Sequence, residues 1–189
     1  LLTYFSSSNH TAAVRAIPGE GLDIPVWILG SSTDSAYLAA AMGLPYAFAS
    51  HFAPTYLMEA LHIYRERFQP SAYLQQPYTM AAVNVVAAET TEAATFASTS
   101  FLQLAKSIIT GKPKALPMPV KSMTGLWSAA EEAAVKQMRA YSCVGDKNLV
   151  QQQLQAFLDD TQVDELMIVS HIYDQEVKLR SYEIVAEIA

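Results

Sequence analysis

The amino-acid sequence predicts an α/β fold in which the β-strands run parallel. Short apolar runs alternate along the chain with segments of helical periodicity. The runs lack polar–apolar alternation, which favours strands that are covered on both faces. Connections long enough to hold a helix join parallel strands. Four predicted strands meet these criteria, at residues 24–29, 44–49, 78–88 and 165–170.

Two architectures can be built from four such strand–helix units. One is a doubly wound open sheet. The other is a (β/α)8 barrel, which needs eight strands and about 250 residues, so that 189 residues supply only half of it. Periodicity alone does not choose between them. In both architectures the functional groups lie at the carboxyl ends of the strands.

The first two units have clear boundaries. The strand at 24–29 ends at Gly30, and residues 31–42 open with hydroxyl side chains that are typical of a helix start. Gly43 stops this helix. The strand at 44–49 leads to a helix at 55–68, whose apolar residues recur every three to four positions.

The later part of the chain contains two units and an irregular excursion. The strand at 78–88 continues into a long helix at 89–109. Residues 110–124 hold three prolines and no periodicity, so we expect an excursion there. Two helices at 129–141 and 147–158 follow, with Val144-Gly145-Asp146 read as the break between them. The strand at 165–170 leads to a last helix at 174–188.

Composition excludes several classes of protein. With 51% hydrophobic and 16% charged residues, the chain is not a disordered, solvated one. A net charge of -6 with scattered Lys and Arg argues against a nucleic-acid surface. The single cysteine, Cys143, excludes an internal disulfide and a multi-cysteine metal site. No apolar stretch approaches the roughly 18 residues of a membrane span, so we expect a cytoplasmic protein without a membrane partner.

The loop after the first strand is a candidate anion site. Gly30 permits close approach of the backbone, and a helix start offers free N–H groups to an anion. Hydroxyls at Ser31, Ser32 and Ser35 add possible donors to a phosphate. The alternative is that one of these serines, or Asp34, only caps the helix, and the residues alone favour capping. No dinucleotide or P-loop signature is present.

Two histidines follow predicted strands. Ser50-His51 ends the second strand and Ser170-His171 ends the fourth. Either imidazole can contact a ligand or be satisfied locally. The two interpretations are balanced for His51, whereas for His171 a local contact with Asp174 is favoured. Neither histidine has a second ligand at metal-binding spacing, so we expect no metal site.

Several stretches together resemble the bacterial luciferase-like flavin monooxygenase family, in its alkanal-monooxygenase-like branch. The similarity runs nearly end to end and keeps the order of the motifs. It is carried by PVWILGSSTDSAYLAAAMGLPYAFASHFAP (25–54), VNVVAAET (83–90), GLWS (125–128), VGD (144–146), DELM (164–167) and RSYEI (180–184).

The resemblance implies a TIM barrel of which residues 1–189 are the C-terminal half, with strands five to eight. Residues 110–124 then match the family's insertion between the last two strands. A free half-barrel would expose apolar surface. We therefore expect a missing N-terminal half of the same barrel, of roughly 130 to 150 residues by comparison with a complete barrel. The family also implies a homodimer.

The resemblance further implies a monooxygenase that uses reduced FMN and oxygen on an aldehyde or another small organic substrate, with a separate flavin reductase as functional partner. The FMN phosphate would lie at Gly30, Ser31, Ser32 and Ser35, which reverses the preference for capping. Ser50 and His51 would lie near the flavin ring. No catalytic residue is identified in this half. The alternatives are a deazaflavin-dependent oxidoreductase and a non-catalytic flavin-binding or partner subunit.

Overall fold

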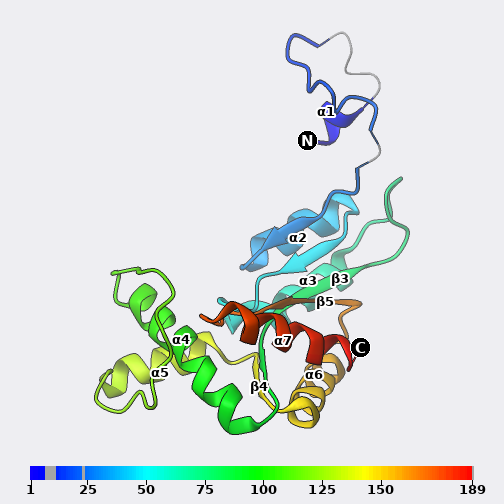
Figure 1. The fold of residues 1–189 in the computed structure, drawn as a ribbon. Coiled ribbons are helices and arrows are strands. Elements are labelled where there is room, and N and C mark those ends of the chain that lie inside the picture. Colours follow the sequence, from blue (N-terminus) through cyan, green and yellow to red (C-terminus); the bar gives the residue numbers. More distant parts are fainter. Residues whose placement is uncertain (7–11, 23, 189) are drawn as a thin grey trace.

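Five parallel strands form a single sheet in the computed structural model, which describes residues 1–6, 12–22 and 24–188 (Figure 1). The strands pair in the order β1-β2-β3-β4, and β5 pairs with β3. Every pair in the sheet is parallel, which confirms the predicted fold class. The strands are β1 (Ile28–Gly30), β2 (Tyr46–Phe48), β3 (Thr79–Ala87), β4 (Ser142–Gly145) and β5 (Glu165–Val169).

Helices connect the strands and cover them. The short N-terminal helix α1 stands away from the sheet, at the end of the segment that leads into β1 (Figure 1). None of the described helices has the length and hydrophobicity that a bilayer crossing requires. The helices are α1 (Leu2–Phe5), α2 (Thr33–Met42), the 3-10 turn η2 (Pro54–Tyr56), α3 (Leu57–Arg67), α4 (Thr91–Ile109), α5 (Ala129–Met138), α6 (Lys147–Thr161) and α7 (Gln175–Ala186).

One face of the sheet carries the main core. Side chains alternate between the two faces of a strand, and Ala81, Val83 and Val85 of β3 point to the same side. They are completely buried beneath residues of α2, α3, α6 and α7, together with Tyr46 and Phe48 of β2. We call this side the outer face, since the connecting helices lie on it.

The opposite side, the inner face, is apolar, and its large side chains on β1 and β5 are exposed. Register aligns Leu29, Ala47 and Met80 in one row across β1, β2 and β3, and it aligns Ala82 with Met167 in the next. Leu29 is 68% exposed and Met167 is 50% exposed. Strands of a parallel sheet are normally covered on both faces. The inner face therefore has the character of a core surface whose second wall is not part of the described chain.

Helix α4 covers the inner face only at the carboxyl end of β3. Val86 and Ala88 pack there against Ala94 and Ala97 of α4 and against Ile172. The small side chains of α4 allow this close contact between helix and strand. The helix thus lies over one end of the inner face and leaves the rows of Leu29 and Met167 open.

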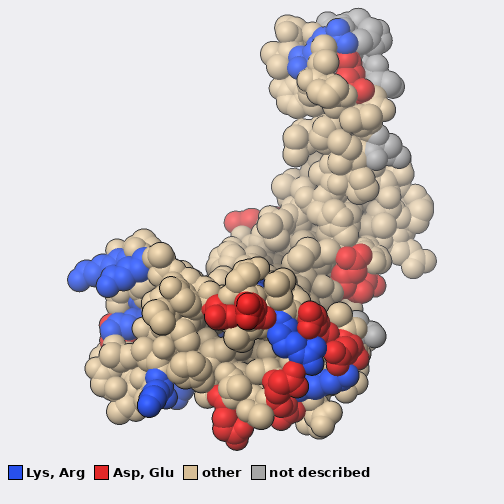
Figure 2. All heavy atoms as spheres, in the orientation of Figure 1, with Lys and Arg blue, Asp and Glu red and all other residues tan. Residues whose placement is uncertain are grey.

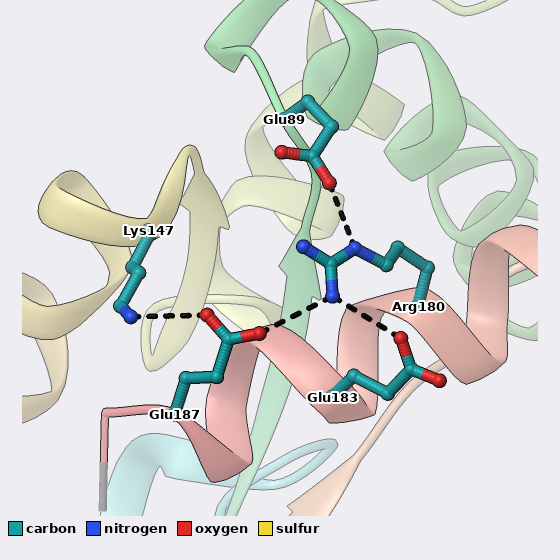
Figure 3. A network of polar contacts seen from close by, with 5 residues as sticks. All are labelled: Glu89, Lys147, Arg180, Glu183 and Glu187. Atoms are coloured by element: carbon teal, nitrogen blue, oxygen red, sulfur yellow. Dashed lines mark hydrogen bonds and ion pairs between the residues drawn. The ribbon is translucent and has the colours of Figure 1, made fainter.

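Exposed ion pairs tie the carboxyl end of β3 to α6 and α7 (Figure 3). Arg180 of α7 contacts Glu89 at 2.7 Å, Glu183 at 3.1 Å and Glu187 at 3.3 Å, while Lys147 contacts Glu187 at 3.0 Å. Hydrogen bonds to these carboxylates raise the pKa of Arg180 above its ordinary value. Charged side chains of both signs gather where α6 meets α7 (Figure 2). Because such exposed pairs contribute little to the free energy of folding, we interpret them as contacts that orient α6 and α7 relative to the end of β3.

Most predicted elements are confirmed, with ends that shift by a few residues. The strand predicted at 24–29 is an exception, because β1 covers only Ile28–Gly30. Its one partner strand is β2, which pairs with it over three residues. Residues 24–27 have the composition of a strand, but β2 begins only at Tyr46, opposite Ile28, so they lie beyond the ladder.

The strand β4 replaces the break between two helices that the sequence predicts at Val144-Gly145-Asp146. Ser142 to Gly145 pair with Asn84 to Ala87 of β3. This pairing crosses the whole excursion and two helices, so no local pattern indicates it. The sheet consequently contains the four predicted strands and one short additional strand beside the carboxyl end of β3.

Candidate functional site

The parallel sheet brings the predicted site residues to one edge. Strands β1, β2, β3 and β5 run in the same direction, so the residues that follow them gather at their carboxyl ends. The loop after β1 holds Gly30 to Ser32, the loop after β2 holds Ser50 and His51, and the loop after β5 holds His171. This edge of the inner face is the candidate site.

Gly30 is required by the packing of the helix that follows it. A Cβ atom at this position would lie 1.9 Å from Ser35 Oγ and 2.3 Å from Ser35 Cβ. The absence of a side chain therefore lets the first turn of α2 fold directly over the end of β1. This gives Gly30 a structural role that is compatible with the close backbone approach expected from the sequence.

The hydroxyl of Ser35 is used inside the protein. It donates to the carbonyl oxygen of Ser32 at 2.8 Å and lies 3.0 Å from the hydroxyl of Tyr46. Burial raises the pKa of Tyr46, so its hydroxyl stays protonated. Ser35 thus holds the helix start to β2. Its predicted contact with a phosphate stays a prediction, and its proton already has acceptors.

The start of α2 lacks a side-chain cap. Ser32 is the N-cap residue, yet its side chain makes no capping hydrogen bond, and neither Ser31 nor Ser32 hydrogen-bonds to the described residues through its hydroxyl. The N–H groups of the first helical turn have no intrahelical acceptors. Helices α4, α5, α6 and α7 differ, because a side chain caps each of them, namely Thr90, Ser128, Asp146 and Asp174. Ser31 and Ser32 therefore do not cap α2, and their hydroxyl groups are available to donate to an anion.

Ser50 and Ser170 fasten the ends of their strands to β3. Ser50 is fully buried and donates to the carbonyl oxygen of Ala82 at 2.7 Å. Ser170 donates to the carbonyl oxygen of Val85. Both hydroxyls replace ladder hydrogen bonds at the point where the strand ends. The predicted contact of Ser50 with a cofactor stays a prediction, but its proton is committed to Ala82.

Asn84 joins the two histidines. It is 2% exposed and lies on the inner face of β3, between Ala82 and Val86 and opposite Val169 of β5. Its amide nitrogen donates to the carbonyl oxygen of His51, and its amide oxygen lies 2.9 Å from Nδ1 of His171. The expected contact between His171 and Asp174 is wrong, because Asp174 accepts from the N–H of Val177 and caps α7.

Aromatic side chains hold both imidazole rings. Phe101 of α4 stacks on His171, with ring centroids 4.9 Å apart and planes inclined by 15°. Phe52 meets His51 edge-on at 4.7 Å. Burial lowers the pKa of both histidines, and the pKa of His171 is lowered further by repulsion from Lys178 and from His51 when that ring is protonated. Both rings are therefore neutral near pH 7.

The lowered pKa values of His51 and His171 predict how the free energy of unfolding depends on pH. The unfolded chain takes up protons at its histidines near pH 6.5, whereas the folded chain resists protonation of these two rings. We expect the free energy of unfolding to fall as the pH drops below about 6.5 and to recover above it. Melting temperatures measured between about pH 7.5 and 5.5 test this. The fall must be shallower in His171→Phe than in the control His62→Phe, whose histidine is exposed on α3; equal slopes would contradict the assignment.

Two further titratable side chains, Cys143 and Arg139, have pKa values that burial shifts. Cys143 of β4 is 4% exposed, and burial raises its pKa to about 12, so it is a packed thiol and not a nucleophile. Burial lowers the pKa of Arg139, whose guanidinium makes no hydrogen bond or ion pair with the described residues. No group of three potential metal-binding side chains occurs among the described residues.

Comparison with known proteins identifies related chains. A sequence model of the luciferase-like monooxygenase family matches residues 3–165. A protein of Escherichia coli K12 with the name luciferase-like monooxygenase is 43% identical over 188 residues, which cover 100% of this chain and 56% of that protein. The structure of apo-MsnO8 is 29% identical, with a TM-score of 0.76 over 94% of this chain and 54% of that one. The chain thus spans about half the length of the relatives it matches.

Two more distant structures share the fold and contain a cofactor. The oxygenating constituent of a 3,6-diketocamphane monooxygenase from Pseudomonas putida, in complex with FMN, has a TM-score of 0.56 at 17% identity and covers 90% of this chain and 48% of that chain. An F420-dependent secondary alcohol dehydrogenase with an F420–acetone adduct has a TM-score of 0.59 at 12% identity, over 93% and 52% of the chains. The parallel sheet is consistent with half of a TIM barrel, in agreement with the predicted architecture.

Proposed function

The chain belongs to the luciferase-like monooxygenase family, and on this premise we propose that it forms the C-terminal half of a barrel that binds reduced FMN. The enzyme uses the flavin and oxygen to oxidise an aldehyde or another small organic molecule. The observation that carries this proposal is the uncapped start of α2, where Ser31 and Ser32 keep their hydroxyls free beside unsatisfied N–H groups.

The residues at the edge fit a phosphate group. Hydroxyl and backbone N–H donors at one helix start, without a competing side-chain cap, are the donors that phosphate takes in proteins. Ser31 and Ser32 would hold the phosphate, and Gly30 lets the backbone come close. Ser35 contributes by fixing the helix start to Tyr46. We therefore propose that the FMN phosphate binds after β1.

The apolar inner face supports the rest of the site. Leu29, Ala47, Ala82 and Met167 offer a surface on which a flat ring system excludes water. Once bound, the reduced flavin supplies the electrons for oxygen chemistry, and the protein supplies binding, orientation and exclusion of water. Residues 1–189 act as one half-domain in this account, with 110–124 as an irregular insertion.

The open inner face requires a second wall. We assign this role to an N-terminal half of the same barrel, because the matched relatives are nearly twice as long as this chain. The complete barrel pairs as a homodimer and receives its reduced FMN from a separate flavin reductase. Membership of the family supports the homodimer and the reductase as proposals, and the exposed Leu29 and Met167 support the second wall.

Two alternative functions remain distinguishable by experiment. A deazaflavin-dependent oxidoreductase is favoured by the structural likeness to the F420-dependent alcohol dehydrogenase. A non-catalytic flavin-binding subunit would use the same edge without turnover. Formation of the carboxylic acid from a long-chain aldehyde by the full-length protein with reduced FMN and oxygen, above the level without the protein, separates the monooxygenase from both alternatives.

The phosphate assignment predicts a ligand-selective loss of affinity. Changing Ser31 and Ser32 together to Ala should weaken FMN by about tenfold to a hundredfold, since a hydrogen bond to a charged group contributes about 1.5–3 kcal/mol. Riboflavin, which lacks the phosphate, should bind with nearly unchanged affinity. Flavin fluorescence titration of the full-length protein measures both constants. Ser128→Ala, which removes the cap of α5, is the control, and equal losses for the two ligands would refute the assignment.

A further inference from the structure

The hydrogen bonds of Asn84 fix the protonation of His171. A backbone carbonyl can only accept, so the amide atom that faces the carbonyl of His51 is the nitrogen Nδ2. The atom 2.9 Å from His171 Nδ1 is then the oxygen Oδ1, which also only accepts. His171 must therefore carry its proton on Nδ1. In the neutral ring this leaves a lone pair on Nε2.

His51 has the opposite tautomer to His171, with its proton on Nε2. Its Nδ1 is buried and has no hydrogen-bond partner among the described residues. An N–H buried without an acceptor is rarer in proteins than an unfilled acceptor, which favours the lone pair at Nδ1 and the proton on Nε2. Burial keeps this ring neutral as well. His51 thus offers a donor where His171 offers an acceptor.

The two free ring atoms face the site. Nε2 of each histidine makes no hydrogen bond with the described residues, and neither atom is among those buried without a partner, so both reach the surface. Phe101 and Phe52 hold the rings from the sides. The strands β2 and β5, which precede His51 and His171, flank β3 and are about 10 Å apart at two strand spacings. A ligand edge between them meets a donor on one side and an acceptor on the other.

We propose that His51 and His171 recognise the cyclic imide edge of the ring that flavins and deazaflavins share. Nε2 of His171 accepts from the imide N–H, and Nε2–H of His51 donates to the adjacent carbonyl oxygen. Asn84 is the positioning residue that holds His171 in the required tautomer. This inference rests on the proposed function, because it needs a flavin-type ring at the inner face.

Ligand discrimination in the full-length protein tests the recognition. FMN should bind about tenfold or more tightly than 3-methyl-FMN, in which a methyl group replaces the imide hydrogen and leaves the acceptor of His171 unpaired. The preference should disappear in His171→Phe, which removes the acceptor. The exposed His62→Phe is the matched control and should keep the full preference.

A spectroscopic readout tests the tautomer independently of binding. Nitrogen-15 shifts should show His171 protonated on Nδ1 in the wild type and a mixture of tautomers in Asn84→Leu. The Nε2 signal should move when FMN is added. A wild-type His171 protonated on Nε2, or equal affinity for FMN and 3-methyl-FMN, overturns the inference and leaves the proposed function standing. No uptake of FMN by the intact wild-type protein overturns the proposed function and this inference with it.

Discussion

Residues 1–189, expressed as a separate chain, are expected to self-associate through the inner face of the sheet. Leu29 and Met167 present long, exposed apolar side chains there, and the largely buried Ala47 and Ala82 lie between them. An apolar sheet face of this kind is a core surface and loses free energy by exposure to water. The double change Leu29→Lys and Met167→Lys should therefore convert the associated chain to a monomer in sedimentation velocity.

A matched control separates this face from exposed apolar residues in general. Leu179 of α7 is 52% exposed but lies on a helix, so Leu179→Lys should leave the association unchanged. Co-expression with the N-terminal half of the barrel should suppress association of the unmodified chain and give a defined complex. A wild-type chain that is monomeric without that half would contradict the account of the inner face.

Loss of Arg65 is expected to lower the stability of the fold. Its guanidinium donates to the carbonyl oxygens of Thr161, at 2.9 Å, and of Gln162, at the end of α6. The side chain thereby links α3 to α6, which are far apart in sequence. Arg65→Met removes charge-assisted hydrogen bonds and leaves helix carbonyls without a partner, which costs about 2–4 kcal/mol. Urea denaturation of the full-length protein measures the change.

The same helix provides the control for this change. Arg67 is two residues further along α3, is exposed and makes no hydrogen bond with the described residues. Arg67→Met should shift the free energy of unfolding by less than about 0.5 kcal/mol. If the two variants lose stability equally, Arg65 contributes to the free energy of unfolding through the charge of α3 and not through its contacts with α6.

The fold was largely predictable because its signals are local. The nine-residue strand β3 is an apolar run, and the helices around it have periodic apolar residues with glycine or polar residues at their ends. The strand β4 shows the limit of this reasoning. Four residues, Ser142 to Gly145, become a strand only because the end of β3 lies beside them. That neighbour is a product of the tertiary fold.

The candidate site was predictable only in part. Positions after strand ends identified Ser31, Ser32 and His51, since parallel strands gather such residues at one edge. The sequence did contain one signal for Asn84, a polar residue within the apolar run of β3. Its function as the link between two histidines depends on pairing across 33 and 87 residues of sequence. The sequence instead favours a contact between His171 and the nearby Asp174, because the two residues are only three positions apart.

A crystal structure of the full-length protein with FMN tests the central claim most directly. The account predicts the phosphate at the start of α2, within hydrogen-bond distance of Ser31 and Ser32, and the ring on the inner face with its imide edge at His51 and His171. It also predicts an N-terminal half of the barrel over Leu29 and Met167. A flavin phosphate bound elsewhere, with water or protein side chains at the start of α2, would contradict it.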